Sequence, residues 1–175
     1  MMAETTGVVT LIPENIPDEL AERPQWVCWR YETRDGKPTK VPYTPESGQR
    51  ASTTDLMTWR TLEDALGCLE ADTAELLRLP HYDGVGFVLS SGDPFVGVDL
   101  DACRNPETGE IAEWAQKIID RVQDGYIEVS PSGTGIHIIV KGTVRGSGKT
   151  QRRVESGKIE MYSRERFLTI TGELP

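Results

Sequence analysis

Two aspartates two residues apart, Asp99 and Asp101, are the residues of this chain best placed to do chemistry. They end a short apolar, β-branched run that begins at Phe95 and is typical of a buried strand. Because side chains alternate across a strand, both carboxylates point to one face, with Cβ atoms roughly 7 Å apart. They repel each other unless a positive charge lies between them, and a divalent cation such as Mg²⁺ would supply it. The alternative is a strand that runs into an acidic loop, with Asp101 capping the next element.

A glycine-containing loop and a histidine form the second candidate group. Residues 130–135, Ser-Pro-Ser-Gly-Thr-Gly, separate two expected strands over residues 126–129 and 136–141. The two glycines allow backbone conformations that are closed to other residues, and exposed amides in such a loop would bind an anion. His137 lies between two isoleucines and therefore faces the side of the sheet opposite to theirs. The alternative is a hairpin turn with an incidental histidine.

A segment near the C-terminus contributes a third carboxylate. Residues 158–162, Lys-Ile-Glu-Met-Tyr, alternate in polarity and predict a strand with Glu160 on one face and its two apolar neighbours on the other. Arg164 and Arg166 follow in a tight connection to a last expected strand over residues 167–171.

The composition predicts a globular domain with an uneven distribution of charge. The chain has 175 residues, of which 37% are hydrophobic and 27% charged, and its net charge is −9. Residues 141–166 nevertheless carry eight basic residues against three acidic ones. Such a local basic segment, rather than the global charge, decides whether a phosphate backbone can bind. The alternative is a solvated surface loop.

Several classes of protein and site are disfavoured by pattern. No apolar stretch approaches the ~18 residues of a membrane helix and no signal peptide opens the chain, so we expect a cytoplasmic protein. The cysteines Cys28, Cys68 and Cys103 form no Cys-x-x-Cys pair, which argues against a zinc site or a disulfide framework and predicts buried, reduced thiols. Residues 146–150 resemble the end of a P-loop, but Thr143 stands where that motif needs glycine, and no helix is expected after it.

The N-terminal part predicts a hairpin. An aromatic-rich strand over residues 25–31 is followed by the turn signal Asp35-Gly36 and by a returning strand over residues 40–43. Pro42 cannot donate a backbone hydrogen bond, so it puts this second strand at the edge of a sheet.

The rest of the chain predicts helices that support the sheet. The turn at residues 91–94 predicts that strands over 84–90 and 95–100 pair as an antiparallel hairpin. Asp72 and Glu75 predict a capping box at the start of a short helix. The expected helices cover residues 16–22, 55–70, 72–79 and 111–122.

Three segments, in this order, resemble the archaeo-eukaryotic primase superfamily, and more narrowly the primase-polymerase domains of phage and plasmid replication proteins. They are Gly-Val-Asp-Leu-Asp101, Ser-Pro-Ser-Gly-Thr-Gly-Ile-His137, and Ile-Glu-Met-Tyr162 with Ser-Arg-Glu-Arg-Phe-Leu-Thr-Ile-Thr-Gly after it. Gln-Trp-Val-Cys-Trp-Arg30 and Lys-Val-Pro-Tyr43 resemble the leader module of the same branch. The resemblance covers nearly everything from about residue 16 onward.

The resemblance implies a two-lobed α+β fold, with an antiparallel, RRM-like catalytic sheet backed by helices and an N-terminal αβ module beside it. It implies a flexible leader over residues 1–12 and a catalytic domain over residues 13–175. Within that domain, the N-terminal module covers about residues 13–82 and the catalytic module about residues 83–175. We expect the domain to be part of a longer replication protein in the bacterial host cytoplasm, with a helicase domain or partner.

The resemblance also implies template-directed nucleotidyl transfer, as DNA primase, DNA polymerase or both, on single-stranded DNA template, primer and dNTP or NTP. Asp99, Asp101 and Glu160 match the acids that would hold two Mg²⁺ or Mn²⁺ ions, and His137 matches the histidine that meets the nucleotide phosphates. The family often has serine at the position of Gly135, so a backbone amide or Ser132 would have to substitute for it. The other implied nucleotide-binding residues are Gly133, Thr134, Arg164 and Arg166. Candidates for weaker contacts with DNA are Lys40, Lys149, Arg152 and Arg153.

Two other classes of function stay open. A metal-dependent nuclease could use the same three acids, although it would have little use for a triphosphate-binding loop, histidine and arginine set. A replication-initiator module without catalysis would bind DNA but show no metal-dependent affinity for nucleotides. A rolling-circle nickase is disfavoured, because the two histidines lie far apart and form no His-x-His pair.

Overall fold

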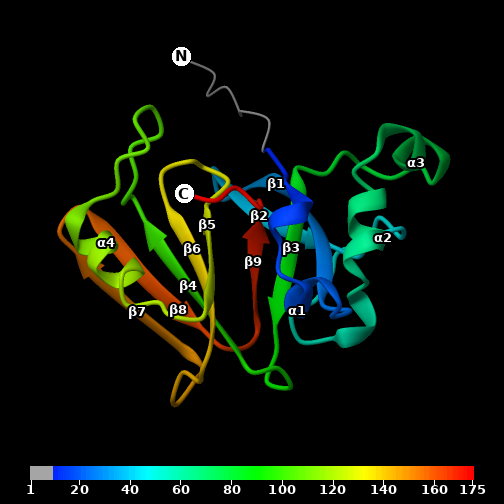
Figure 1. Ribbon diagram of the computed structural model, residues 1–175. Coiled ribbons are helices and arrows are strands. Elements are labelled where there is room, and N and C mark those ends of the chain that lie inside the picture. The colour runs from blue at the N-terminus through cyan, green and yellow to red at the C-terminus, as the bar shows by residue number, and fades with distance from the viewer. Residues whose placement is uncertain (1–9) are drawn as a thin grey trace.

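The computed structural model describes residues 10–175, which form two antiparallel β-sheets side by side with helices on their outer sides (Figure 1). The four-stranded sheet has the order β2-β1-β3-β9. It consists of β1 (Trp26–Arg34), β2 (Lys37–Tyr43), β3 (Gly84–Leu89) and β9 (Arg166–Ile170). The five-stranded sheet has the order β5-β6-β4-β8-β7. It consists of β4 (Phe95–Asp101), β5 (Gly125–Val129), β6 (Ile136–Lys141), β7 (Lys149–Val154) and β8 (Gly157–Tyr162).

The helices are short, with four to seven residues each. The α-helices are α1 (Asp18–Ala21), α2 (Leu62–Gly67), α3 (Ala71–Leu76) and α4 (Glu113–Ile119). Single 3₁₀ turns occur at η1 (Pro13–Asn15) and η2 (Leu56–Thr58). In Figure 1, α4 covers the outer face of the five-stranded sheet, and α2 lies beside the four-stranded sheet on the opposite side of the molecule. Antiparallel sheets with few helices agree with the expected mixture of α and β structure.

One face of the five-stranded sheet is apolar because every second residue of its inner strands is aliphatic. Val98 and Leu100 of β4 pack with Ile136 and Ile138 of β6 in one buried cluster that also contains Ala115 of α4. The residues between them in sequence point to the other face, which is turned toward the four-stranded sheet. The strand alternation thus separates a face that packs against α4 from a face that carries the polar residues, which we call the polar face and which also contributes Phe95 to the core between the sheets.

The two sheets pack against each other through a core that both supply. This core includes Trp26 and Phe87 of the four-stranded sheet, whose rings meet edge to face with centroids 5.3 Å apart. The sheets are in close contact at Gly97 of β4, where a Cβ atom would lie 2.8 Å from Leu89 Cδ1 and closer still to Leu168. Only glycine fits between these leucines without movement, so its absent side chain sets the spacing of the sheets.

The last strand of the chain, β9, belongs to the same four-stranded sheet as the first two strands. β3 pairs with β1 on one side and with β9 on the other, so the four-stranded sheet combines strands from both ends of the sequence. The expected division near residue 82 therefore does not coincide with a boundary between sheets.

Several expected elements are confirmed by the structure. Asp35 and Gly36 both have positive φ, 50° and 73°, and connect β1 to β2 in a tight hairpin. β2, which contains Pro42, is an edge strand. The P-loop is excluded, because Lys149 opens a strand rather than a helix.

Other predictions were wrong. β3 and β4 belong to different sheets instead of forming a hairpin, because each finds antiparallel partners more distant in sequence. The helix expected over 55–70 is reduced to η2 and α2, and the capping box belongs to Thr61 and Asp64 of α2 rather than to Asp72 and Glu75. The helices expected over 16–22, 72–79 and 111–122 are shorter in the structure, as α1, α3 and α4. Strand β7 was missed because its exposed residues are polar on both faces, so hydrophobic alternation gives no signal.

Residues 1–9 of the expected leader lie outside the described residues. At its end, the Ile12 amide donates to the Thr171 carbonyl, 2.8 Å away, so this part is bound to the domain. In the described part of the chain, no helix is long and apolar enough to cross a membrane.

Candidate active site

A row of polar side chains crosses the polar face of the five-stranded sheet, with one residue from each strand. The strand register aligns Glu128 of β5, His137 of β6, Asp99 of β4, Glu160 of β8 and Gln151 of β7. Directly opposite residues in antiparallel strands have Cβ atoms about 4.5–5.5 Å apart, so neighbours in the row can interact. The pairing of the strands therefore brings together residues that the sequence separates widely.

Three carboxylates form the centre of this row. Asp99 and Asp101 share one face of β4, and Glu160 enters from β8 directly opposite Asp99. One oxygen of each lies within 4.8 Å of the other two. Carboxylate oxygens in this arrangement suit hard divalent cations such as Mg²⁺ and Mn²⁺. These side chains thus fit the expected metal-binding group.

Lys158 already supplies positive charge to two of the three acids. Its ammonium lies 3.1 Å from Asp101 Oδ2 and 2.6 Å from Glu160 Oε2. The hydrogen bond to Glu160 raises the pKa of Lys158. Burial acts to raise the pKa of Glu160, but hydrogen bonds from Lys158 and from the Tyr162 hydroxyl outweigh it, and the net shift is downward. Glu160 is therefore ionised at neutral pH.

Asp99 is in a different electrostatic position. No lysine or arginine of the described residues forms a salt bridge with it, and its nearest basic neighbour is His137, with Nε2 3.8 Å from Asp99 Oδ1. Burial raises the pKa of Asp99, and the negative charges of Asp101 and Glu160 add to this effect against the opposing influence of His137 and Lys40. Asp99 thus has the most to gain from a bound cation.

A cavity of about 340 Å³ lies beside Asp99, between the two sheets. The five-stranded sheet contributes Asp99 and His137 to its lining, and the four-stranded sheet contributes Lys40 and Arg166. The Arg166 guanidinium lies 4.7 Å from the centroid of the Tyr162 ring, which also lines the cavity. We call this cavity the inter-sheet cleft. Two basic groups on one wall, and on the other an acid that belongs to the carboxylate cluster, suit a polyanion bound together with cations.

Lys40 is held inside the cleft by contacts on its own side. Its ammonium lies 3.4 Å from Thr169 Oγ1 and 5.5 Å from the centroid of the Trp29 ring. Burial lowers the pKa of Lys40, although the nearby acids oppose this shift. A bound phosphate would offset the cost of burying this charge.

The Ser-Gly loop between β5 and β6 is held by hydrogen bonds of its own. The Gly133 amide donates to the Ser130 carbonyl at 2.8 Å, and the Gly135 amide donates to Ser130 Oγ at 3.1 Å. The hydroxyls of Ser132 and Thr134 are 2.9 Å apart. A Cβ atom at Gly135 would lie 2.8 Å from the Leu100 carbonyl oxygen, so glycine allows the end of β4 to approach. The amides of Gly133 and Gly135, which we expected to be exposed for an anion, therefore donate to Ser130 within the loop.

The other basic candidates separate into two groups. Arg164 lies away from the cleft, with Nη2 donating to the Gly146 carbonyl at 2.6 Å in the loop that joins β6 to β7. Lys149 and Arg153 of β7 lie opposite Tyr162 and Lys158, on the polar face. Arg152 lies opposite Ile159, on the face that packs against α4. The strand register therefore shows which basic residues lie on the polar face, a distinction that composition alone does not give.

Sequence reasoning missed two members of the site, Lys158 and Glu128. Lys158 lies two residues before Glu160 in one strand, so alternation alone would have placed both on the same face. Glu128 is fully buried, and its nitrogen partner is on the neighbouring strand. Only the pairing of β5 with β6 brings Glu128 and His137 together, and no local pattern in the sequence gives the register of that pairing.

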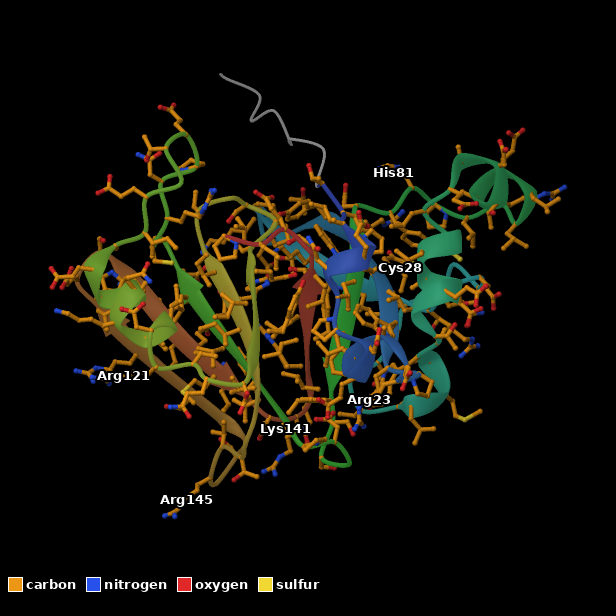
Figure 2. The ribbon with its side chains drawn as sticks, in the orientation of Figure 1. Arg23, Cys28, His81, Arg121, Lys141 and Arg145 are labelled. Atoms are coloured by element: carbon orange, nitrogen blue, oxygen red, sulfur yellow. The ribbon has the colours of Figure 1, made fainter. Side chains whose placement is uncertain are left out.

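The groups outside the site include an exposed histidine, an arginine at a loop tip, and the three cysteines, whose burial the sequence predicts. The side chain of His81 is 89% exposed, and Figure 2 shows it on the loop before β3, on the side of α3. Arg145 extends from the tip of the loop between β6 and β7. The cysteines are buried and form no disulfide.

No protein-family model matches the chain. A stretch of 156 residues, 89% of this chain, is 37% identical to a protein of Nitratiruptor phage NrS-1 named DNA Primase-polymerase. The similarity supports a phage primase-polymerase domain. The resemblance to phage primase-polymerases is thereby confirmed. The chain spans about one fifth of that protein, as the match covers 20% of its length.

Proposed function

We propose that this chain is the catalytic domain of a template-directed nucleotidyltransferase, acting as DNA primase, DNA polymerase or both, with an archaeo-eukaryotic primase fold. The observation that carries the proposal is the inter-sheet cleft, where Asp99 of the carboxylate cluster shares the lining with Lys40 and Arg166. The similarity to the phage primase-polymerase supports the same conclusion. The substrates would be a single-stranded DNA template, a primer and nucleoside triphosphates, and a helicase domain or partner would act with it.

Asp99, Asp101 and Glu160 would hold two divalent ions, Mg²⁺ or Mn²⁺. Such ions, when bound, stabilise the attacking and leaving oxygens of an in-line displacement at phosphorus. The ammonium of Lys158 contacts two of the three acids and would have to move aside or share them.

The remaining residues would bind and orient the nucleotide. His137 faces the cleft beside Asp99, where its Nε2 would meet the phosphates. Arg166 is suited to two-point contact with a triphosphate, because its guanidinium is planar and always charged. The Ser132–Gly135 loop would bind the phosphates after its internal hydrogen bonds are exchanged for bonds to the nucleotide. Arg164 would bind them after its hydrogen bond to the Gly146 carbonyl is broken. The 3′-hydroxyl of the primer, or of a first nucleotide, would attack the α-phosphate and pyrophosphate would leave.

Lys149 and Arg153, on the polar face of β7, would contact the template backbone without reading its sequence. Arg152 lies on the opposite face of the same strand and would contribute less. All three side chains are exposed at the sheet edge.

Primer extension tests the proposal directly. The domain is incubated with single-stranded template, Mn²⁺ or Mg²⁺ and labelled nucleotides, with and without an annealed primer, and the products are separated by size. Pyrophosphate release with extension only from a primer indicates a polymerase, and products without a primer indicate a primase. Release of nucleotides from the DNA instead indicates a nuclease. DNA binding without metal-dependent nucleotide binding indicates a non-catalytic initiator module, and either of these last two results contradicts the proposal.

A further inference from the structure

Glu128 is a fully buried carboxylate at the end of the polar row, and the chemistry described above does not use it. Burying an ionised carboxylate is costly unless hydrogen bonds replace its water. Glu128 has four partners. Its Oε2 accepts from the Tyr126 hydroxyl at 2.7 Å and from the amides of Thr171 and Gly172, both at 2.9 Å.

The other oxygen of Glu128 contacts the active-site histidine. Glu128 Oε1 lies 3.2 Å from Nδ1 of His137, its direct neighbour across β5 and β6. An ionised carboxylate can only accept, so Nδ1 must carry the hydrogen of this bond. The opposite ring nitrogen, Nε2, is thereby directed toward Asp99 and the cleft. The hydrogen-bond partner of one ring nitrogen thus decides which of the two nitrogens carries the hydrogen in a neutral ring.

The same carboxylate joins the two sheets. Thr171 and Gly172 directly follow β9 of the four-stranded sheet, whereas Glu128 and His137 belong to the five-stranded sheet. The Thr171 side chain adds a second link, because its hydroxyl donates to the Val129 carbonyl at 2.7 Å. The ring of His137 is thus held against a fixed point on the seam between the sheets.

We propose that Glu128 is a positioning residue, which holds the His137 ring and fixes the nitrogen that it presents to the nucleotide phosphates. This inference rests on the proposed function. A purely structural anchor for Thr171 and Gly172 would need an acceptor at Oε2 but no carboxylate at Oε1, and this difference makes the two roles separable.

Glu128→Gln separates them. The three donors at Oε2 select the amide oxygen of glutamine for that place, so the amide NH₂ meets His137 Nδ1 and requires it to accept. The ring hydrogen then moves to Nε2, while the anchor of the C-terminal segment stays. Tyr126→Phe is the matched control, because it removes a hydrogen bond to the same carboxylate and none to His137.

The first measurement is the ring of His137 in the folded, metal-free protein. The chain has two histidines, so ¹⁵N-histidine labelling gives two ring spectra, and His81→Gln assigns them. We expect the hydrogen on Nδ1 in the wild type, in Tyr126→Phe and in Glu128→Asp, which retains a carboxylate. We expect it on Nε2 in Glu128→Gln. A wild-type ring without a hydrogen on Nδ1 overturns the proposal even if the glutamine variant does not fold.

The second measurement is the affinity for dATP in the presence of Ca²⁺, together with kcat and KM for dATP in primer extension. To donate from Nε2 to a phosphate while Nδ1 donates to Glu128, the ring must carry both hydrogens, an arrangement that a carboxylate at Nδ1 allows and that the amide NH₂ of glutamine, which needs Nδ1 as an acceptor, opposes. We therefore expect Glu128→Gln to weaken binding and raise KM on the order of tenfold, as for other residues that orient a functional histidine, with Glu128→Asp restoring part of the loss. A reversed ring with unchanged dATP affinity overturns the inference. If the wild type extends no primer, the proposed function fails, whereas the ring spectra and dATP binding still decide the role of Glu128.

Discussion

Neighbouring residues of β4 lie in two different environments. Leu100 is fully buried in the cluster beneath α4, whereas Asp99 and Asp101 on either side of it belong to the carboxylate cluster. The inner strands β6 and β8 repeat this division, with aliphatic residues on one face and members of the polar row on the other. The face beneath α4 serves packing alone, whereas the other face carries, beside the core between the sheets, a group of like charges that the fold must tolerate. The comparison teaches that stability and chemistry are assigned to alternate residues of the same strands.

The variant Asp99→Asn should show the difference between the two faces most clearly, because it should reduce activity and leave stability unchanged. Nucleotide incorporation should fall by a factor of about 10²–10³, the loss typical of one strong electrostatic contributor to a transition state. The melting temperature should stay near the wild-type value, because burial disfavours the charge that is removed. Primer-extension rates and thermal melts measure both effects. Asp120→Asn, at an exposed position after α4, is the control, and wild-type incorporation by Asp99→Asn would contradict the assignment.

The converse change is Leu100→Ala, one residue away on the face that packs against α4. It should cost about 2–5 kcal/mol of unfolding free energy, because it removes buried methyl groups and leaves a cavity. Urea denaturation measures this loss, and incorporation per folded molecule should stay close to the wild-type value. A variant that keeps its stability but loses its activity would show that the two faces are not independent.

Lys158→Met tests how the polar face tolerates its charge. Without the ammonium, Asp101 and Glu160 lose their neutralising partner, so the melting temperature in EDTA should fall by about 2–4 °C. Mn²⁺ should then raise the melting temperature of Lys158→Met more than that of the wild type, because the ion replaces the missing charge. Equal metal-induced shifts in the two proteins would argue against a shared site.

The smallest effect is expected at the sheet edge, where Arg153 and Arg152 differ only in the face of β7 they occupy. Arg153→Ala should reduce the salt-dependence slope of single-stranded DNA binding by about 0.7, the value for one lost phosphate contact. Arg152→Ala should change it less. Fluorescence anisotropy with a labelled oligonucleotide at several salt concentrations measures the slopes, and a larger effect of Arg152→Ala would reverse the assignment.

Local pattern was sufficient for the parts of the site that lie within one strand. The alternation in residues 95–101 placed Asp99 and Asp101 on one face, and the flanking isoleucines placed His137 opposite the core. The tight turn at Asp35-Gly36 and the edge position of Pro42 were also predicted, because each depends on backbone chemistry at one position.

The parts that depend on pairing between distant strands could not be predicted in this way. A short turn between two expected strands favours a hairpin, yet β3 pairs with β1 and β9 whereas β4 pairs with β6 and β8, all of them more distant in the sequence. The contact of Glu128 with Thr171 and Gly172 spans more than 40 residues of sequence and depends on that topology. The resemblance to primase-polymerases supplied the third acid, whose proximity to Asp99 follows from the pairing of β4 with β8.

Gly97 lies two residues before Asp99 on the polar face of β4, where the two sheets meet. Leu168, which lies against Gly97 in this contact, also lines the inter-sheet cleft beside Asp99. A methyl group at Gly97 would push Leu89 and Leu168 outward, and so would move part of the wall of the cleft. The shape of the cleft therefore depends on a residue that has no side chain and does not line it.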